Sequence, residues 1–126
     1  MAETSLLLVL CVAAGGAVGA VLRYLIALVL NPSGGIPWAT LFVNFVGCSL
    51  MALLFFGWPA IPSEIRTFLF VGVFGAFTTM SSLSVETLDL YDSGKVGLAA
   101  ANFGMNLAAC IGGGILGKLA SVLLAP

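Results

Sequence analysis

Four long apolar stretches, separated by short clusters of glycine, proline and polar residues, constrain the fold more than any other feature of this sequence. A helix that crosses a bilayer needs about 20 mostly apolar residues, and each stretch is about that long or longer. Only 7% of the residues are charged, against roughly a quarter in a soluble domain, so a water-facing surface cannot be covered. We therefore expect one all-α domain, residues 1–126, in the cell (inner or plasma) membrane. Its four transmembrane helices are expected at about residues 6–30, 38–58, 65–90 and 96–124.

The composition also excludes several kinds of chemistry. The chain has no histidine, which removes imidazole acid–base catalysis and histidine-ligated metals. Its formal net charge of −1 is not that of a polybasic surface that binds nucleic acid. The sequence shows no nucleophile–base pair and no phosphate-binding loop motif. We therefore expect no enzyme, no organic cofactor and no nucleic-acid partner.

Three cysteines, Cys11, Cys48 and Cys110, lie in apolar runs and lack the CxxC spacing of metal and redox motifs. A free cysteine in such surroundings behaves as a small hydrophobic residue. The sequence alone therefore predicts neither a disulfide nor a metal role for them.

The four basic residues are divided evenly between the two sides of the membrane. Arg66 and Lys118 are expected toward the side of the termini, and Arg23 and Lys95 toward the other. Since Lys and Arg bias sets orientation, either four charges are too few to be informative, or copies insert both ways up and pair as an antiparallel dimer. A chain of four helices is also too small to enclose a pore comfortably, so both readings predict an oligomer.

The third stretch is the least regular. Residues 78–84 read TTMSSLS, with five hydroxyls in seven residues, and glycines at 72 and 75 precede them. A membrane helix can break at such a place, where freed carbonyls and hydroxyls satisfy one another or coordinate a cation. The alternative is a regular helix whose hydroxyls bond back to carbonyls one turn earlier.

Three asparagines within the apolar stretches are further candidates for a functional site inside the membrane. Asn44 lies near the start of the second helix, as an interhelical hydrogen-bonding residue or as a donor that lines an ion path. Asn102 and Asn106 are four residues apart, so they share one helix face, which Cys110 extends. This row is either a polar track for a small ion that sheds water or a hydrogen-bonded packing seam.

Two charged residues interrupt the apolar stretches. Arg23 near the end of the first helix either extends to the membrane surface or forms a vestibule charge that attracts an anion. Glu86 follows the hydroxyl run and is expected near the membrane boundary.

Three motifs resemble those of a known family. Residues 16–24 read GAVGAVLRY, residues 37–47 read PWATLFVNFVG, and residues 72–86 read GVFGAFTTMSSLSVE. In this order, on four short membrane helices, they resemble the small dual-topology fluoride channels called Fluc or CrcB.

The resemblance implies an antiparallel homodimer with two narrow pores, through which toxic fluoride leaves the cell passively while chloride is rejected. It also implies one structural sodium ion at the dimer interface. The ion would be held by the backbone carbonyls of Gly75 and Thr78 from both subunits, in keeping with the oxygen ligands of a broken helix.

The resemblance further implies which residues form the site. The vestibule would contain Arg23 and Glu86. The fluoride pathway would comprise Asn44, Thr79, Met80, Ser82, Leu83, Asn102, Asn106 and Cys110.

The sequence departs from the family pattern at two pore positions. Met80 and Leu83 stand where the family has phenylalanines, whose electropositive ring edges face fluoride. Fluoride would then be dehydrated mainly by the three asparagine amides and the hydroxyls of Thr79 and Ser82. An alternative is that this chain is one half of a heterodimer whose paralogous partner supplies the aromatics.

Two further alternatives belong to other classes. A proton-coupled exporter of the small multidrug resistance type is similar in size only, because its essential membrane glutamate has no counterpart between residues 6 and 30. A membrane subunit without transport activity is equally compatible with glycine-rich helices and buried amides.

Overall fold

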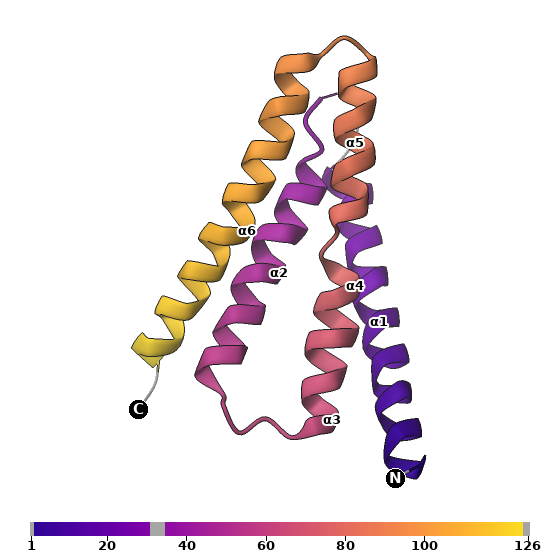
Figure 1. Ribbon diagram of the computed structural model, residues 1–126, viewed down its shortest axis with the longest axis vertical. Coiled ribbons are helices and arrows are strands. Elements are labelled where there is room, and N and C mark those ends of the chain that lie inside the picture. Colours follow the sequence, from indigo (N-terminus) through magenta and orange to yellow (C-terminus); the bar gives the residue numbers. More distant parts are fainter. Residues whose placement is uncertain (1, 31–34, 125–126) are drawn as a thin grey trace.

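The computed structural model of the chain describes residues 2–30 and 35–124, which form four helical spans (Figure 1). The first, second and fourth spans are the single helices α1 (Ala2–Leu30), α2 (Trp38–Gly57) and α6 (Val96–Leu124). All four spans are long and apolar enough to cross a membrane. The predicted all-α class with four membrane spans is therefore confirmed.

The third span is interrupted. It consists of the helical turn α3 (Ser63–Arg66), the π-helical segment η1 (Thr67–Phe74), the short turn α4 (Gly75–Phe77) and the regular helix α5 (Met80–Asp92). Between α4 and α5 the backbone is extended at Thr78 (φ −80°, ψ 155°) and Thr79 (φ −152°, ψ 121°). The predicted break is therefore present, and it lies at the first two hydroxyl residues rather than at a glycine.

The alternative expectation, hydroxyls that bond back to earlier carbonyls, describes the helices on both sides of the break. The Thr78 hydroxyl donates to the Phe74 carbonyl (2.9 Å), and the Ser84 hydroxyl donates to the Met80 carbonyl (2.9 Å). Thr79 differs, because its hydroxyl oxygen accepts from the Ser82 amide and caps α5. The hydroxyl run thus ends one helix and begins the next.

The spans associate in two close pairs, α2 along α6 and α1 along η1 and α4 (Figure 1). Gly117 of α6 faces the Ser49 carbonyl of α2, and Gly19 of α1 faces the Val73 carbonyl of η1. A Cβ at either glycine would collide with that carbonyl, so only glycine permits this approach. Because α5 in turn contacts α6, residues of α2, α5 and α6 meet around the break.

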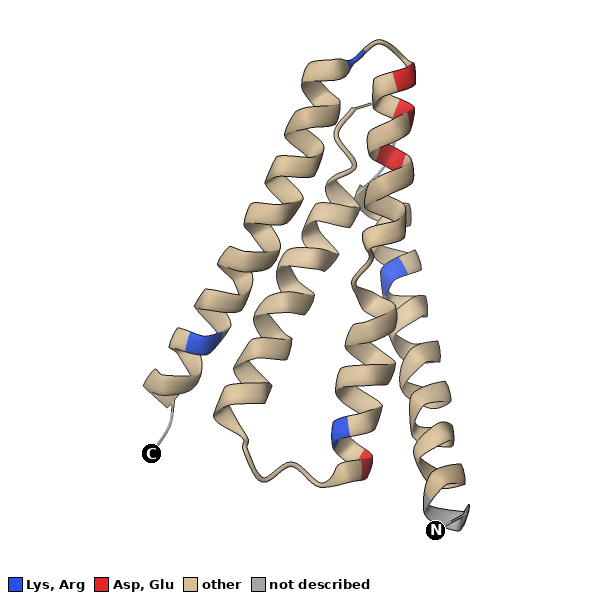
Figure 2. Cartoon of the chain, in the orientation of Figure 1, with Lys and Arg blue, Asp and Glu red and all other residues tan. Residues whose placement is uncertain are grey.

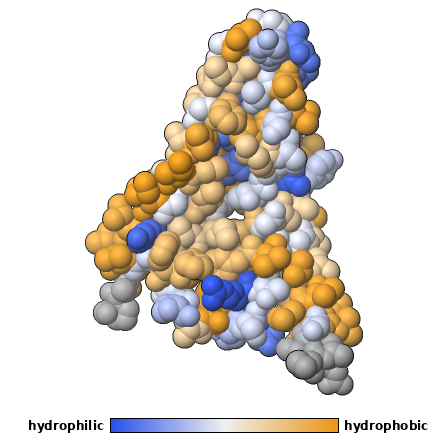
Figure 3. Space-filling model, in the orientation of Figure 1, coloured by the Kyte–Doolittle hydropathy of each residue, from blue (hydrophilic) through white to orange (hydrophobic). Residues whose placement is uncertain are grey.

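The interior of the bundle holds polar side chains beside apolar ones, and its exterior is apolar. Asn102 and Asn106 are 0% exposed and Asn44 is 3% exposed, whereas Leu123 at the periphery is 85% exposed. The space-filling view shows apolar side chains over most of one face (Figure 3). This pattern is the one that a bilayer favours, because lipid solvates apolar side chains and polar groups face the bundle interior.

The charged residues are few, and most of them gather toward the two ends of the bundle (Figure 2). Arg66 lies over the ring of Phe55 (5.4 Å) and Lys118 over the ring of Phe56 (5.0 Å), both near the end of α2. The beginning of α1 and the end of α6 lie at that same end (Figure 1). Lys95 follows α5 at the opposite end, as expected for four spans.

Candidate functional site

The side chain of Asn44 closes the break in the third span. Its Oδ1 accepts the backbone N–H of Thr79 (2.8 Å), and its Nδ2 donates to the carbonyl of the same residue (3.2 Å). The carboxamide thus replaces the helical partners that an extended residue lacks. A backbone group buried without a partner would cost about 1–3 kcal/mol, so α2 directly stabilises the break.

A chain of side-chain amides continues from Asn44 into α6. Asn44 Nδ2 donates to Asn106 Oδ1 (3.0 Å), and Asn106 Nδ2 donates to Asn102 Oδ1 (3.2 Å) and to the Asn102 carbonyl (3.0 Å). Asn102 Nδ2 then donates to the Thr87 hydroxyl (3.0 Å) on α5. The structure therefore joins all three predicted asparagines in one network, whose amide donors largely serve neighbouring oxygens of the same chain.

The predicted hydroxyl residues form the start of α5. Thr79 Oγ1 accepts from the Ser82 amide (3.1 Å) and lies 3.1 Å from the hydroxyls of both Ser81 and Ser82. The N-terminus of a helix carries a partial positive charge from its aligned peptide dipoles. The break therefore combines a helix terminus with a cluster of hydroxyl groups, and both favour an anion nearby.

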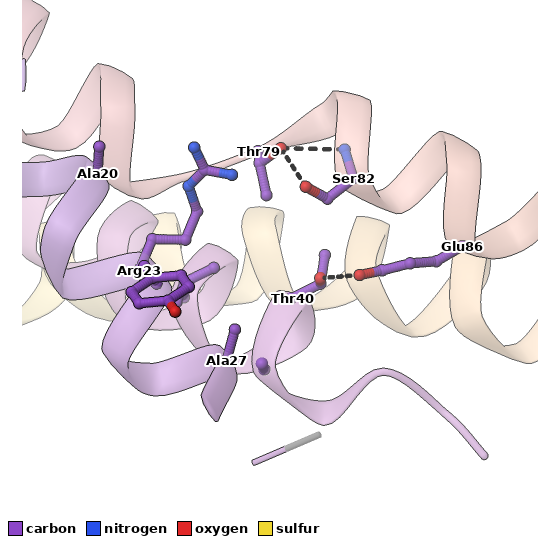
Figure 4. Close-up of a pocket in the computed structure, with 10 residues that line it drawn as sticks. Ala20, Arg23, Ala27, Thr40, Thr79, Ser82 and Glu86 are labelled. Carbon is purple, nitrogen blue, oxygen red and sulfur yellow. Dashed lines mark hydrogen bonds between the residues drawn. The ribbon is translucent and has the colours of Figure 1, made fainter. Parts of the chain in front are cut away.

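A cavity of about 240 Å³ lies on one side of the break; we call it the Arg23 cavity (Figure 4). Its lining includes both predicted vestibule residues, Arg23 and Glu86. Thr40 donates to Glu86 Oε1 (2.7 Å), while the buried Oε2 has no hydrogen-bond partner among the described residues. The full lining of the Arg23 cavity is Ala20, Arg23, Tyr24, Ala27, Ala39, Thr40, Val43, Thr79, Ser82 and Glu86.

Arg23 lies at the break, where its side chain bonds the protein backbone. Its Nε donates to the carbonyl of Ala76 (3.0 Å), near the end of α4. In Figure 4 its guanidinium extends toward the segment that carries Thr79. A helix C-terminus carries a partial negative charge, so this contact both satisfies an orphaned carbonyl and places a positive charge at the cavity.

A second cavity, of about 200 Å³, lies on the other side; we call it the Asn44 cavity. It brings together six of the predicted pathway residues. Its full lining is Asn44, Cys48, Thr78, Thr79, Met80, Leu83, Phe103, Asn106, Leu107 and Cys110. Thr79 lines both cavities. Of the other two predicted residues, Ser82 lines the Arg23 cavity, and Asn102 is buried behind Asn106.

Sequence reasoning missed three residues of the Asn44 cavity: Phe103, Leu107 and Cys48. Phe103 lies three positions before Asn106, so helical spacing places it close to the polar stripe. Its aromatic side chain could have marked it as a candidate, because Met80 and Leu83 replace the two pore phenylalanines of the family pattern. Cys48 follows Asn44 by four positions on the same face of α2, which was also visible in the sequence.

These features define a class of protein. A small multi-pass membrane protein that buries uncharged polar groups and borders them with two cavities has the architecture of a channel or transporter. Residues 10–118 match the family of CrcB-like proteins (Camphor Resistance, CrcB), and the chain belongs to that family.

The chain is also similar to curated relatives named fluoride-specific ion channel FluC. A protein from Thermus thermophilus is 53% identical over 94 residues, 71% of this chain and 75% of the relative. That from Elusimicrobium minutum is 41% identical over 116 residues, 90% and 92% of the two chains. That from Magnetococcus marinus is 38% identical over 118 residues, 90% and 96%.

Proposed function

We propose that this protein is a fluoride-selective channel through which fluoride leaves the cell passively across the cell membrane. The observation that carries the proposal is the match to relatives named fluoride-specific ion channels over nearly the whole chain. The four apolar spans and their buried polar break support the same function. The relatives' names favour fluoride over the multidrug-type substrate considered from size alone.

The proposed pathway runs from the Arg23 cavity past Thr79 into the Asn44 cavity. Arg23 supplies the only positive side chain among the residues that line either cavity, so an anion is attracted there. Fluoride is small and strongly hydrated, and it needs hydrogen-bond donors in place of the water it sheds. The hydroxyls of Thr79 and Ser82 are such donors. The amides of Asn44 and Asn106, with Asn102 in support, would serve the ion by exchanging the oxygens that they now hold.

Phe103 supplies an aromatic ring in the cavity where Met80 and Leu83 replace the family's phenylalanines. The ring lines the same cavity as both residues and as Asn106. An aromatic edge is electropositive, so it can face an anion without a charge. We propose that this ring, on α6 rather than on α5, takes over part of the missing aromatic contact.

A second copy of the chain, antiparallel to the first, completes the proposed channel. Met80 is 63% exposed in the single chain although it lines the Asn44 cavity. A partner subunit would cover this side, and the balanced charges favour insertion in both orientations. A paralogue with aromatic residues at the positions of Met80 and Leu83 is the alternative partner.

The break also frees two backbone carbonyls that suit the proposed sodium ion. In a continuous helix, the Gly75 carbonyl would accept the Thr79 N–H, which instead donates to Asn44 Oδ1 (2.8 Å). The Thr78 carbonyl would accept the Ser82 N–H, which instead donates to Thr79 Oγ1 (3.1 Å). Carbonyl oxygens without helical donors are the ligands that broken membrane helices offer to sodium. These residues therefore fit a structural Na⁺ held between two subunits.

The test is an efflux measurement with the chain alone. Purified protein is reconstituted into liposomes loaded with potassium fluoride or potassium chloride, and ion loss is followed with selective electrodes. Fast fluoride loss with chloride retained is the expected result. A folded protein that retains both ions would contradict a self-sufficient channel, and restoration of fluoride loss by a Phe-containing paralogue would establish the heterodimer.

A further inference from the structure

The Asn44 cavity contains two cysteines, and the fluoride pathway, which includes Cys110 alone, does not explain why they are paired. Cys48 of α2 and Cys110 of α6 both line this cavity, and their two helices pack along each other. Neither forms a disulfide. The pair sits beside the proposed path, one helical turn away from the bonded amides of Asn44 and Asn106.

The packing of α2 on α6 fixes this pair. Asn44 and Asn106 are in contact (3.0 Å), and the cysteines follow them by four positions in each helix. Because positions four apart share one helix face, two helices that run in the same direction repeat the contact one turn further on. The Ser49 carbonyl lies against Gly117 at the next turn, which keeps the two backbones close there.

We propose that Cys48 and Cys110 form a binding site for a soft cation that takes two sulfur ligands in line, such as the cuprous ion. Sulfur ligands select soft cations over the hard sodium ion. Among the described residues there is no cluster of three or more His, Cys, Asp or Glu side chains. The site therefore suits a two-coordinate ion rather than zinc, which takes four ligands. The thioether of Met80, another soft ligand, lines the same cavity.

Binding would proceed without electron transfer. Each thiol releases its proton, because the thiolate is the metal ligand, and two sulfur–metal bonds form. With a monovalent cation the resulting complex carries one negative charge. In the proposed fluoride path it would repel the permeating anion as well as fill the cavity, a consequence that rests on the proposed function.

The binding test uses silver, a redox-stable monovalent ion with the same two-coordinate preference, in chloride-free buffer without reductant. Silver is titrated into the purified full-length protein, and the remaining free thiols are counted with a thiol reagent. One silver ion per chain should protect two thiols and leave Cys11 reactive.

The matched control Cys11→Ser should bind silver as the natural chain does. Cys48→Ser and, independently, Cys110→Ser should weaken silver binding roughly 100-fold or more, because each removes one of two linked ligands.

The efflux test separates this site from the proposed function. Silver should block fluoride efflux from liposomes that carry the natural chain or Cys11→Ser, and should leave the residual efflux of folded Cys48→Ser or Cys110→Ser unchanged. Protection of one thiol per silver ion, or equal binding by all variants, would overturn the site. Two protected thiols in a protein that conducts no fluoride would leave the site standing and contradict the channel.

Discussion

At the residue scale, one side-chain amide governs the site. Asn44 uses both Nδ2 protons to bond oxygens, the Thr79 carbonyl and Asn106 Oδ1, and uses its own oxygen to hold the Thr79 N–H. The same group therefore holds the break in the third span, links α2 to α6 and borders the Asn44 cavity. A residue with both donors and an acceptor is needed, and the amide side chains alone offer this combination in one plane.

The first prediction concerns this amide. Asn44→Asp replaces two N–H donors with a carboxylate oxygen that faces two other oxygens, and it places a negative charge beside the proposed anion path. We expect fluoride efflux to be abolished while the dimer still assembles, with a stability loss of about 1–3 kcal/mol for the unpaired groups. Efflux is measured by electrode and assembly by size-exclusion chromatography.

The control for this change is Ser84→Ala, which removes a hydroxyl that bonds only within α5 and should leave efflux intact. Normal efflux in a folded Asn44→Asp protein would remove this residue from the pathway.

A second prediction at this scale tests the ring of Phe103. Phe103→Leu keeps an apolar side chain of similar bulk but removes the electropositive edge, so fluoride efflux should fall with little change in thermal stability. The matched control is Phe42→Leu. Phe42 is equally exposed (45% against 46%) but lines an apolar groove away from the break. Equal efflux from both variants would show that the ring does not contact the ion.

At the element scale, close helix contacts set the register on which both cavities depend. Gly117 meets the Ser49 carbonyl, and Gly113 meets the Phe45 carbonyl, where an added Cβ would come within 2.7 Å. These contacts align α2 with α6 so that Asn44 reaches Asn106 and so that Cys48 and Cys110 line one cavity. The spacing of the polar residues is therefore a consequence of where the glycines lie.

Gly117→Ala should separate α2 from α6. Its new methyl group would fall on the Ser49 carbonyl, and such overpacking costs about 1–3 kcal/mol. We expect a lower melting temperature and reduced efflux. Gly114→Ala, three positions away, is the matched control, since a Cβ there meets nothing within 4 Å and alanine favours the helix by up to about 1 kcal/mol. Equal effects of the two changes would contradict the role of this contact.

The elements differ in how far the sequence determines them. The fourth helix, expected at 96–124, spans those residues, because its apolar length and its flanking turn are local properties. A break near the hydroxyl run was also foreseeable. Its position at Thr78 and Thr79 was not, because the partner that stabilises it, Asn44, comes from another helix. The shared cavity of Cys48 and Cys110 was hidden for the same reason, because it depends on the register between α2 and α6.

At the scale of the whole molecule, the proposed channel needs two copies, and sodium would join them. Gly75 and Met80 are exposed on the single chain, on either side of the break. If carbonyls of both subunits hold a sodium ion, replacing sodium with a bulky organic cation should lower fluoride efflux, and sodium should restore it. Thr78→Val should respond to sodium in the same way, because it removes a hydroxyl and keeps the carbonyl. Efflux that is independent of sodium throughout would contradict the site.

The orientation of the copies can be tested through the charge balance. The basic residues are spread along the bundle: Arg66 and Lys118 lie at one end, Lys95 at the other, and Arg23 between them at the break. In a variant without natural cysteines, Ser63→Cys and Ser93→Cys place single thiols at opposite ends and keep all four charges. A membrane-impermeant maleimide applied to intact cells should label about half the copies of each if both orientations occur. Full labelling at one position and none at the other would establish a fixed topology.

Adding Lys95→Ser to Ser63→Cys leaves the termini side more basic, so that side should move to the cytoplasm and its labelling should fall. A dual topology that depends on so few charges should respond to the loss of one, whereas an orientation fixed by other means should not.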